Sequence, residues 1–206
     1  IREGWIENLV PQLYWGLNKK IASARTLTDW WSKQGFGRHV YIGQDVKVTM
    51  DSCELAEKMM LSRTTEGIQG NCWWPDYKQC ATTLADYWQM NYAIPPAYPW
   101  LSQHTPGEVG NLQCRHFKGS SILSWTAPKA AKPIEEARFY VVYIVPDGQK
   151  PDLSNSAYIA GVTSECSYVL PPLSHGRYVA YIAVLDRCNN LSRHPARISL
   201  LTQIVH

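Results

Sequence analysis

Val10–Gly16 reads VPQLYWG and Gly37–Gln44 reads GRHVYIGQ, and both stretches have the apolar and aromatic character of β-strands. We expect strands over residues 6–15 and 38–43. Residues 19–34 (KKIASARTLTDWWSKQ), which lie between them, have apolar side chains at the three- and four-residue spacing of an amphipathic helix. A strand, a helix and a second strand in this order predict parallel strands joined by a helical crossover.

The same alternation continues to residue 92. A helix is expected over residues 51–63, a third strand over residues 67–74 (GIQGNCWW) and a third helix over residues 78–92. Three parallel strands alone would leave two unpaired edges. The first half is therefore predicted to be α/β, a partial (β/α) barrel of about three β/α units. Its exposed strand at 6–15 is expected to pair with another copy or with a barrel segment upstream of it.

The second half of the chain has a different pattern. Residues 93–110 carry four prolines and no periodicity, which is typical of a linker. After it, turn residues separate seven short apolar stretches, which favours an all-β sandwich. We therefore expect two domains, residues 1–104 and residues 105–206. The seven expected strands are 111–114, 121–125, 137–145, 157–162, 167–170, 177–184 and 196–201.

Composition narrows the classes of partner. The first 104 residues hold ten basic and ten acidic residues, and the remainder hold ten basic and seven acidic, which gives the net charge of +3. No run of Lys or Arg stands out, so a nucleic-acid partner is not expected. None of the six cysteines forms a C-x2-C pair, so no metal site is predicted, and no cofactor motif is present. No run of 18 apolar residues predicts a membrane span, and no signal peptide is present.

Tryptophan is abundant and unevenly distributed. Eight of the nine Trp lie in the first 104 residues. Such a cluster forms either an aromatic-rich core or a surface that stacks on flat apolar ligands, among which are pyranose rings.

Strand alternation predicts which side chains would face the barrel interior, away from the helices. Gln12 and Tyr14 are expected there from the first strand, and His39 and Tyr41 from the second. From the third strand we expect Gln69, Asn71 and Trp73, with Ile68 and Cys72 toward the helices. The strand ends and the loops that follow them would form a sugar-binding rim. The predicted substrate-binding residues are Gln12, Tyr14, Trp15, Tyr41, Gln44, Trp73 and Trp74.

Two aspartates follow the second and third strands. Asp45 and Asp76 are the candidate catalytic residues, since glycoside hydrolysis uses a pair of carboxylates that flank the scissile bond. Aspartate at such positions also serves as a turn or helix-cap residue. The sequence leaves both roles open for each of them, and it leaves core packing open for the rim aromatics.

VPQLYWG, followed by DWWSKQGFGRHVYIGQ and the Trp73-Trp74 strand, resembles the barrel of the glycosyl hydrolase-like family ten, known mainly from bacteria. The resemblance implies the last three of eight barrel units, a carbohydrate partner, and a periplasmic, cell-surface or secreted location. It also implies that part of the catalytic machinery lies on strands upstream. The residues that carry it are Pro11, Gln12, Tyr14, Trp15, Trp30, Trp31, Gly37, Arg38, His39, Tyr41, Ile42, Gly43 and Gln44.

The second half resembles a fibronectin type III domain. Trp125 in SILSWTAP, Tyr140 in RFYVVYIV, and Tyr178 after LPPLSHGR carry this likeness. The resemblance implies a scaffold or spacer, since a fold does not fix a function. Three functions follow as hypotheses: part of a glycoside hydrolase, a non-catalytic carbohydrate-binding or adhesion module, and a structural fragment without activity of its own.

Overall fold

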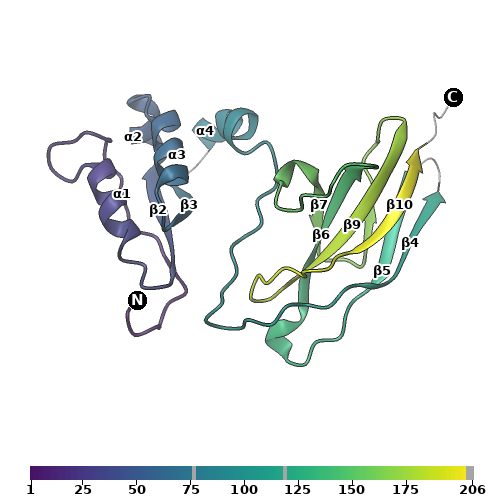
Figure 1. The fold of residues 1–206 in the computed structure, drawn as a ribbon. Helices are drawn as coiled ribbons and strands as arrows, with labels where there is room; N and C mark the ends of the chain where they lie inside the picture. The colour runs from purple at the N-terminus through teal and green to yellow at the C-terminus, as the bar shows by residue number, and fades with distance from the viewer. Residues whose placement is uncertain (76–77, 118–119, 203–206) are drawn as a thin grey trace. The chain divides into compact units, whose positions relative to one another are not determined.

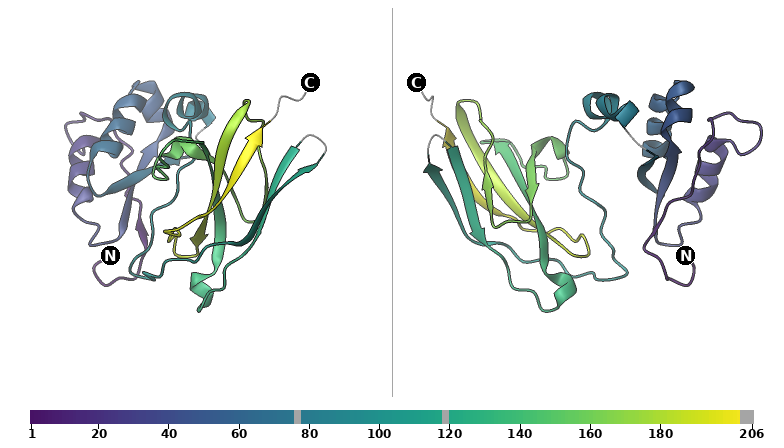
Figure 2. Two further views of the ribbon diagram at one scale, coloured as in Figure 1. Left: turned by 45° about the vertical axis from the view of Figure 1, so that its right-hand side comes forward. Right: turned by 180° about the vertical axis from the view of Figure 1, so that it is seen from behind.

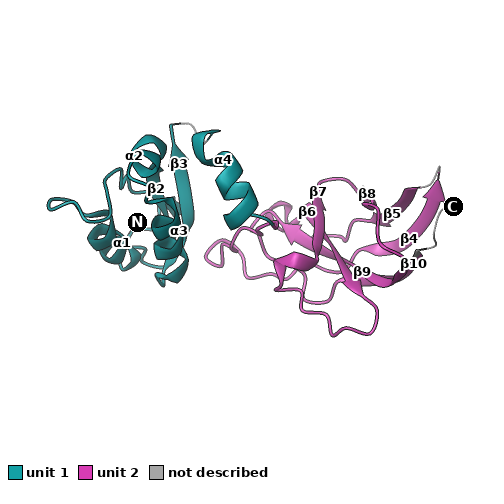
Figure 3. Cartoon of the chain, turned by 90° about the horizontal axis from the view of Figure 1, so that it is seen from above, with its two compact units in different colours: residues 1–90 teal, residues 91–206 magenta. Residues whose placement is uncertain are grey.

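A computed structural model of the chain describes residues 1–75, 78–117 and 120–202 (Figure 1). The chain divides into two compact units, residues 1–90 and residues 91–206, which are coloured separately in Figure 3. The first unit contains a small parallel sheet with helices, and the second contains antiparallel strands.

The sheet of the first unit has the order β1-β2-β3, and its strands are parallel. They are β1 (Asn8–Leu9), β2 (His39–Asp45) and β3 (Ile68–Trp74). The strand predicted over residues 6–15 is much shorter than expected, partly because Pro11 has no N–H to donate to a ladder. Beyond β1 the chain meets β2 again through a bridge between Gln12 and Gly43.

Among the described residues of this unit are α1 (Ala24–Ser32), α2 (Val46–Asp51), α3 (Leu55–Thr64), α4 (Lys78–Thr83) and the π-helical turn η1 (Leu84–Trp88). Helix α1 begins later than predicted because Ser23 caps it, and Ser23 Oγ accepts from the Thr26 N–H. The helix predicted over residues 51–63 corresponds to α3, which begins later, at Leu55, and α2 before it was not predicted. Cys53 separates the two helices, because its φ of 55° is incompatible with a continuing helix.

The prediction of a partial (β/α) barrel is wrong. The three parallel strands form an open sheet, and within the described residues nothing closes it. A barrel requires tilted and staggered strands that bring the last one back to the first, which three strands cannot achieve. After β3, the short α4 and η1 lead into the second unit, whose strands pair only among themselves.

An extra residue in β3 changes which side chains face the helices. Val40 pairs with Ile68, but Tyr41 pairs with Gly70, so Gln69 is a β-bulge. The Gln69 Oε1 accepts the Val40 N–H at 2.8 Å. The predicted alternation is therefore inverted after the bulge, and Asn71 lies toward the helices, where its Oδ1 accepts from the Ser62 hydroxyl of α3 at 2.7 Å.

The second unit consists of two antiparallel sheets, β4-β5-β8 and β10-β9-β6-β7. The two sheets face one another, as the views in Figure 2 show. They share a core that includes Leu123, Trp125, Tyr140 and Ile182. Each strand overlaps one of the seven predicted ones, whereas the likeness to fibronectin type III stays a prediction. The strands are β4 (Gly110–Phe117), β5 (Ser120–Thr126), β6 (Ala137–Pro146), β7 (Ile159–Thr163), β8 (Ser167–Val169), β9 (Gly176–Asp186) and β10 (Ala196–Thr202).

The hairpin after β9 ties the preceding proline-rich segment to the second unit. Asn189 Nδ2 donates to the Pro96 carbonyl at 3.1 Å, and the Tyr98 N–H donates to the Cys188 carbonyl at 2.8 Å. Within the hairpin, the fully buried Asp186 carboxylate accepts two backbone N–H groups at 2.8 Å each. Residues 94–102 are thus packed as part of this unit.

None of the six cysteines, all of which lie in the described part of the chain, forms a disulfide bond, and Cys80 and Cys188 are buried. No cluster of three or more metal-ligating side chains occurs among the described residues. Across the same residues, no helix has the length and apolar character needed to cross a membrane.

Candidate functional site

The strand ends of the first unit converge at one edge of the parallel sheet. Asp45 pairs with Trp74 in the register of β2 and β3, so both strands end at the same level. The first segment reaches the same edge, because Gln12 forms a bridge with Gly43, two residues before Asp45. Tyr14 and Trp15 come directly after this bridge in the sequence. The carboxyl edge of parallel strands is where ligands bind in open α/β sheets.

Two indole rings at this edge are exposed to solvent. Trp15 is 36% exposed and Trp74 is 58% exposed. Burying so large an apolar surface is favourable, so rings left open at a sheet edge are available to pack on another molecule. The Lys19 ammonium lies 6.0 Å from the centre of the Trp15 ring.

The open face of the sheet extends this surface. Tyr41 is half-buried, and its ring lies over Gly70, where a Cβ would come within 3.6 Å of Tyr41 Cδ1. Gln12 is exposed and Tyr14 is half-buried. Gln12 and Tyr14 lie on the segment that leads to Trp15, and Tyr41 lies on β2, which pairs with β3 and its last residue Trp74.

Gln44 and Trp73 lie on the other face, against the helices, which differs from the position expected for rim residues. Trp73 packs against the apolar cluster that includes Val46, Leu55 and Met59. Gln44 is 2% exposed, and its Nε2 donates to Asn71 Oδ1 at 3.1 Å. Both side chains thus lie on the opposite face of the sheet from Tyr41 and Trp74.

Asp45 is engaged as a helix cap. Its Oδ1 accepts the Val48 N–H at 2.7 Å, at the first turn of α2. This is the N-cap arrangement, which satisfies one of the free N–H groups at the start of a helix. Asp76, the other catalytic candidate, lies outside the described residues.

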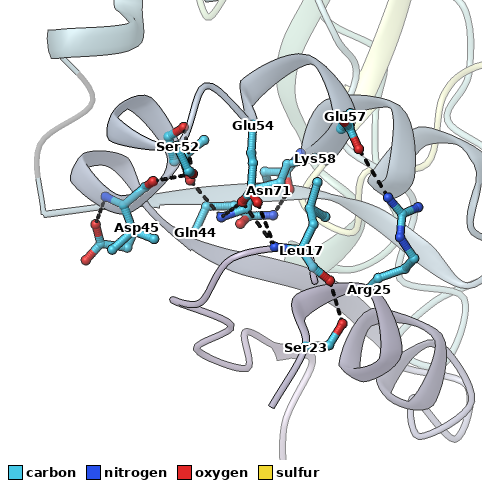
Figure 4. Close-up of polar contacts among 12 residues, drawn as sticks. Leu17, Ser23, Arg25, Gln44, Asp45, Ser52, Glu54, Glu57, Lys58 and Asn71 are labelled. Atoms are coloured by element: carbon cyan, nitrogen blue, oxygen red, sulfur yellow. Dashed lines mark hydrogen bonds and ion pairs between the residues drawn. The ribbon is translucent and has the colours of Figure 1, made fainter. Parts of the chain in front are cut away.

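A buried polar group behind the sheet was not identified from the sequence. The Glu54 carboxylate accepts the Leu17 N–H with both oxygens, at 3.0 and 3.1 Å, as Figure 4 shows. Lys58, one helical turn later, has no exposed surface, and its Nζ lies 3.7 Å from Glu54 Oε2. The Lys58 Nζ also donates to Thr49 Oγ1 at 2.9 Å. The only sequence signal was Glu and Lys at a spacing of four residues, which is common on exposed helix faces.

Burial acts on the charge of Lys58. Loss of hydration lowers the pKa of its ammonium below the ordinary value of 10.5, and the nearby Glu54 carboxylate partly opposes this effect. Desolvation disfavours the charged form, whereas an opposite charge favours it. Glu54 is therefore the counter-ion of an otherwise enclosed cation.

Comparison with known proteins gives one significant curated relative. No family model matches the chain. The chain is 25% identical, over 159 residues, to a protein described as glycosyl hydrolase YngK of Bacillus subtilis (strain 168). That alignment covers 69% of this chain and 31% of the relative, so the chain spans about a third of the relative's length.

Solved structures give weaker similarities. The Spr0440 glycoside hydrolase domain, Endo-D, of Streptococcus pneumoniae R6 matches with 12% identity and a TM-score of 0.37, over 48% of this chain and 16% of that one. The spore cortex lytic enzyme SleM of Clostridium perfringens matches with 12% identity and a TM-score of 0.36, over 94% and 67% of the two chains.

The sequence relationship is therefore to glycosyl hydrolase proteins, and it supports a glycoside hydrolase-like or carbohydrate-related role. The narrower placement in the glycosyl hydrolase-like family ten stays a prediction.

Proposed function

We propose that residues 1–90 supply part of the sugar-binding surface of a glycoside hydrolase-like protein. The observation that carries the proposal is the pair of exposed indole rings, Trp15 and Trp74, at the carboxyl edge of the parallel sheet. The likeness to a glycosyl hydrolase gives independent support, because it points to carbohydrate as the ligand class.

The chemistry of the surface suits a sugar. A pyranose ring presents a flat C–H face, which stacks on an indole ring, and hydroxyl groups around its rim, which need hydrogen-bond partners. Trp15 and Trp74 provide the rings. The exposed amide of Gln12 and the hydroxyl groups of Tyr14 and Tyr41 provide donors and acceptors.

A hydrolytic role would require two carboxylates at this surface. Asp45 and Asp76 are the proposed pair, with Asp76 two residues after Trp74 in the sequence. The helix cap made by Asp45 favours a second function, non-catalytic glycan binding, because a carboxylate that holds a backbone N–H has less freedom to transfer protons.

Calorimetric titration of the chain with cellohexaose, xylohexaose, mannohexaose and chitohexaose would test the proposal. We expect saturable binding to one of these sugars, and a loss of about tenfold in affinity in W15A and in W74A. Trp side chains that a ligand covers on binding commonly dominate the binding energy. The matched control is W30A, because Trp30 is 50% exposed but lies on α1. Equal losses in all three variants, or no binding to any sugar, would contradict the proposed surface.

A second measurement separates hydrolysis from binding alone. The bound oligosaccharide would be incubated with the chain and with D45N and D76N, and new reducing ends would be counted. Cleavage that depends on either aspartate supports the hydrolase. Binding without cleavage, unchanged in both variants, supports the non-catalytic function.

A further inference from the structure

We propose that Glu54 is a positioning residue for this surface: it fixes the Gly16–Lys19 turn, and with it the Trp15 ring that precedes the turn, while Lys58 holds Glu54 from the other side. The inference rests on the proposed function, because Trp15 is one of the two indole rings assigned to the sugar. Glu54 itself would not touch the ligand.

The turn is held on several sides. The Leu17 N–H donates to the Glu54 carboxylate of α3 at 3.0 Å. The Leu17 carbonyl accepts the Ser23 hydroxyl at 2.5 Å, and the Gly16 carbonyl accepts the Ala24 N–H at 3.2 Å. Two of these contacts come from the start of α1 and one from α3, so the backbone beside Trp15 is fixed from two helices.

Of these three contacts, the one between Leu17 and Glu54 joins the residues that are furthest apart in the sequence, by 37 residues. Hydrogen bonds to an ionised carboxylate are about twice as strong as neutral ones, and here both oxygens converge on a single N–H.

Lys58 keeps the carboxylate in place. Its Nζ lies 3.7 Å from Glu54 Oε2 and is anchored on the other side by Thr49 Oγ1, and Lys58 is fully buried. Figure 4 shows the contact of Glu54 with Leu17 and, apart from it, the ion pair of Arg25 and Glu57. The arrangement links the enclosed cation to the exposed turn through one carboxylate.

A fixed turn lowers the cost of binding. Immobilising a flexible side chain on complex formation typically costs a sizeable part of the binding energy, and a site that is already ordered avoids it. We therefore expect that loss of the Glu54 contact weakens sugar binding about tenfold through a more mobile Trp15.

The test compares variants that differ in the Glu54 contact but leave no unpaired buried charge. K58M retains Glu54 and its bond to Leu17, and E54L/K58M removes the bond and both charges. E57L on the same helix is the surface control. The chain is labelled with 5-fluorotryptophan, and its Trp15 and Trp73 signals in fluorine NMR are assigned with W15F and W73F.

The expected result is a Trp15 signal that stays narrow in E57L, broadens partly in K58M, which loses the support of Glu54 by Lys58, and shifts or broadens most in E54L/K58M, while the Trp73 signal is unchanged. The affinity for the oligosaccharide bound by the unmodified chain should be unchanged in E57L and lowest in E54L/K58M. An unchanged Trp15 signal in E54L/K58M would overturn the inference. So would a Trp73 signal that changes equally, since that would indicate general loss of structure.

The outcomes separate this inference from the proposed function. If the unmodified chain binds no oligosaccharide, the proposed function fails, and the role of Glu54 in sugar binding fails with it. If sugar binding depends on Trp15 but not on Glu54, the proposed function stands and the positioning role is overturned.

Discussion

Replacing Glu54 by Gln should destabilise residues 1–90 much more than the same change at Glu57. Lys58 Nζ lies 3.7 Å from Glu54 Oε2, and at an effective dielectric constant of about 20 this gives an attraction of about 4 kcal/mol. E54Q leaves the fully buried Lys58 ammonium without its counter-ion, and breaking a buried pair in this way costs about 3–5 kcal/mol. The Arg25–Glu57 side chains are 51% and 65% exposed, so E57Q should cost less than about 1 kcal/mol.

A double-mutant cycle measures this difference. Urea unfolding of the whole chain would be followed by Trp fluorescence, which reports mainly on the first unit because seven of the nine Trp lie in residues 1–90. E54Q, K58M and their combination should give a coupling energy of about 3 kcal/mol, against less than about 1 kcal/mol for E57Q with R25Q. A coupling no larger than that of the surface pair would refute the reasoning, because Lys58 would then not be a paired buried cation.

The pH dependence supplies a second test of the same pair. Burial lowers the pKa of Lys58 below its ordinary value of 10.5, so the unfolded chain holds this proton more tightly than the folded one. The free energy of unfolding should therefore rise as the pH increases from the folded-state pKa of Lys58 toward 10.5. E54Q should lower that pKa further, so the difference in unfolding free energy between E54Q and the unmodified chain should shrink as the pH rises toward 10.5. If the difference in unfolding free energy between E54Q and the unmodified chain stays constant or grows with pH, Lys58 is not the titrating group.

Three other substitutions probe separate features. D45A should destabilise α2 by about 1 kcal/mol in urea unfolding, because it removes the cap, whereas D45N should keep most of the stability. G43A should loosen the bridge between Gly43 and Gln12, because a Cβ would lie 2.9 Å from the Pro11 carbonyl oxygen. Faster exchange of the backbone amides near this bridge would show the effect. G107A is the control, because its Cβ would make an ordinary contact at 3.6 Å. D186A should lower the stability of the second unit by about 3 kcal/mol in calorimetry, because it leaves two backbone N–H groups of the hairpin without their acceptor. A melting transition unchanged in D186A would contradict this role.

The second unit was the more predictable from sequence. Its strands are short apolar stretches separated by turn residues, and these local signals determined each strand position to within a few residues. The first unit was less predictable because its departures depend on single residues. Cys53 takes a positive φ between α2 and α3, and Pro11 follows the short β1. Neither a Cys between two helical stretches nor a Pro in an apolar stretch predicts such a break from the sequence alone.

The candidate surface was predicted in part, for a related reason. Trp15 and Trp74 were named from their positions after strands, and they are exposed at the strand ends. Glu54 and Lys58 were not identified, because Glu and Lys four residues apart on a helix usually form an exposed pair. Only the packing of α3 shows that Lys58 is enclosed.

The β-bulge at Gln69 explains why strand alternation failed and why the surface has its present composition. Without the extra residue, Trp73 would face the open side of the sheet and Trp74 the helices. With it, Trp73 packs against the apolar cluster, and Trp74 is level with Asp45 at the exposed edge. The sequence contains one hint, Gly70, whose φ of 155° suits glycine and whose missing side chain leaves room for the Tyr41 ring. A single inserted residue therefore determines which of two adjacent indole rings is available to a ligand.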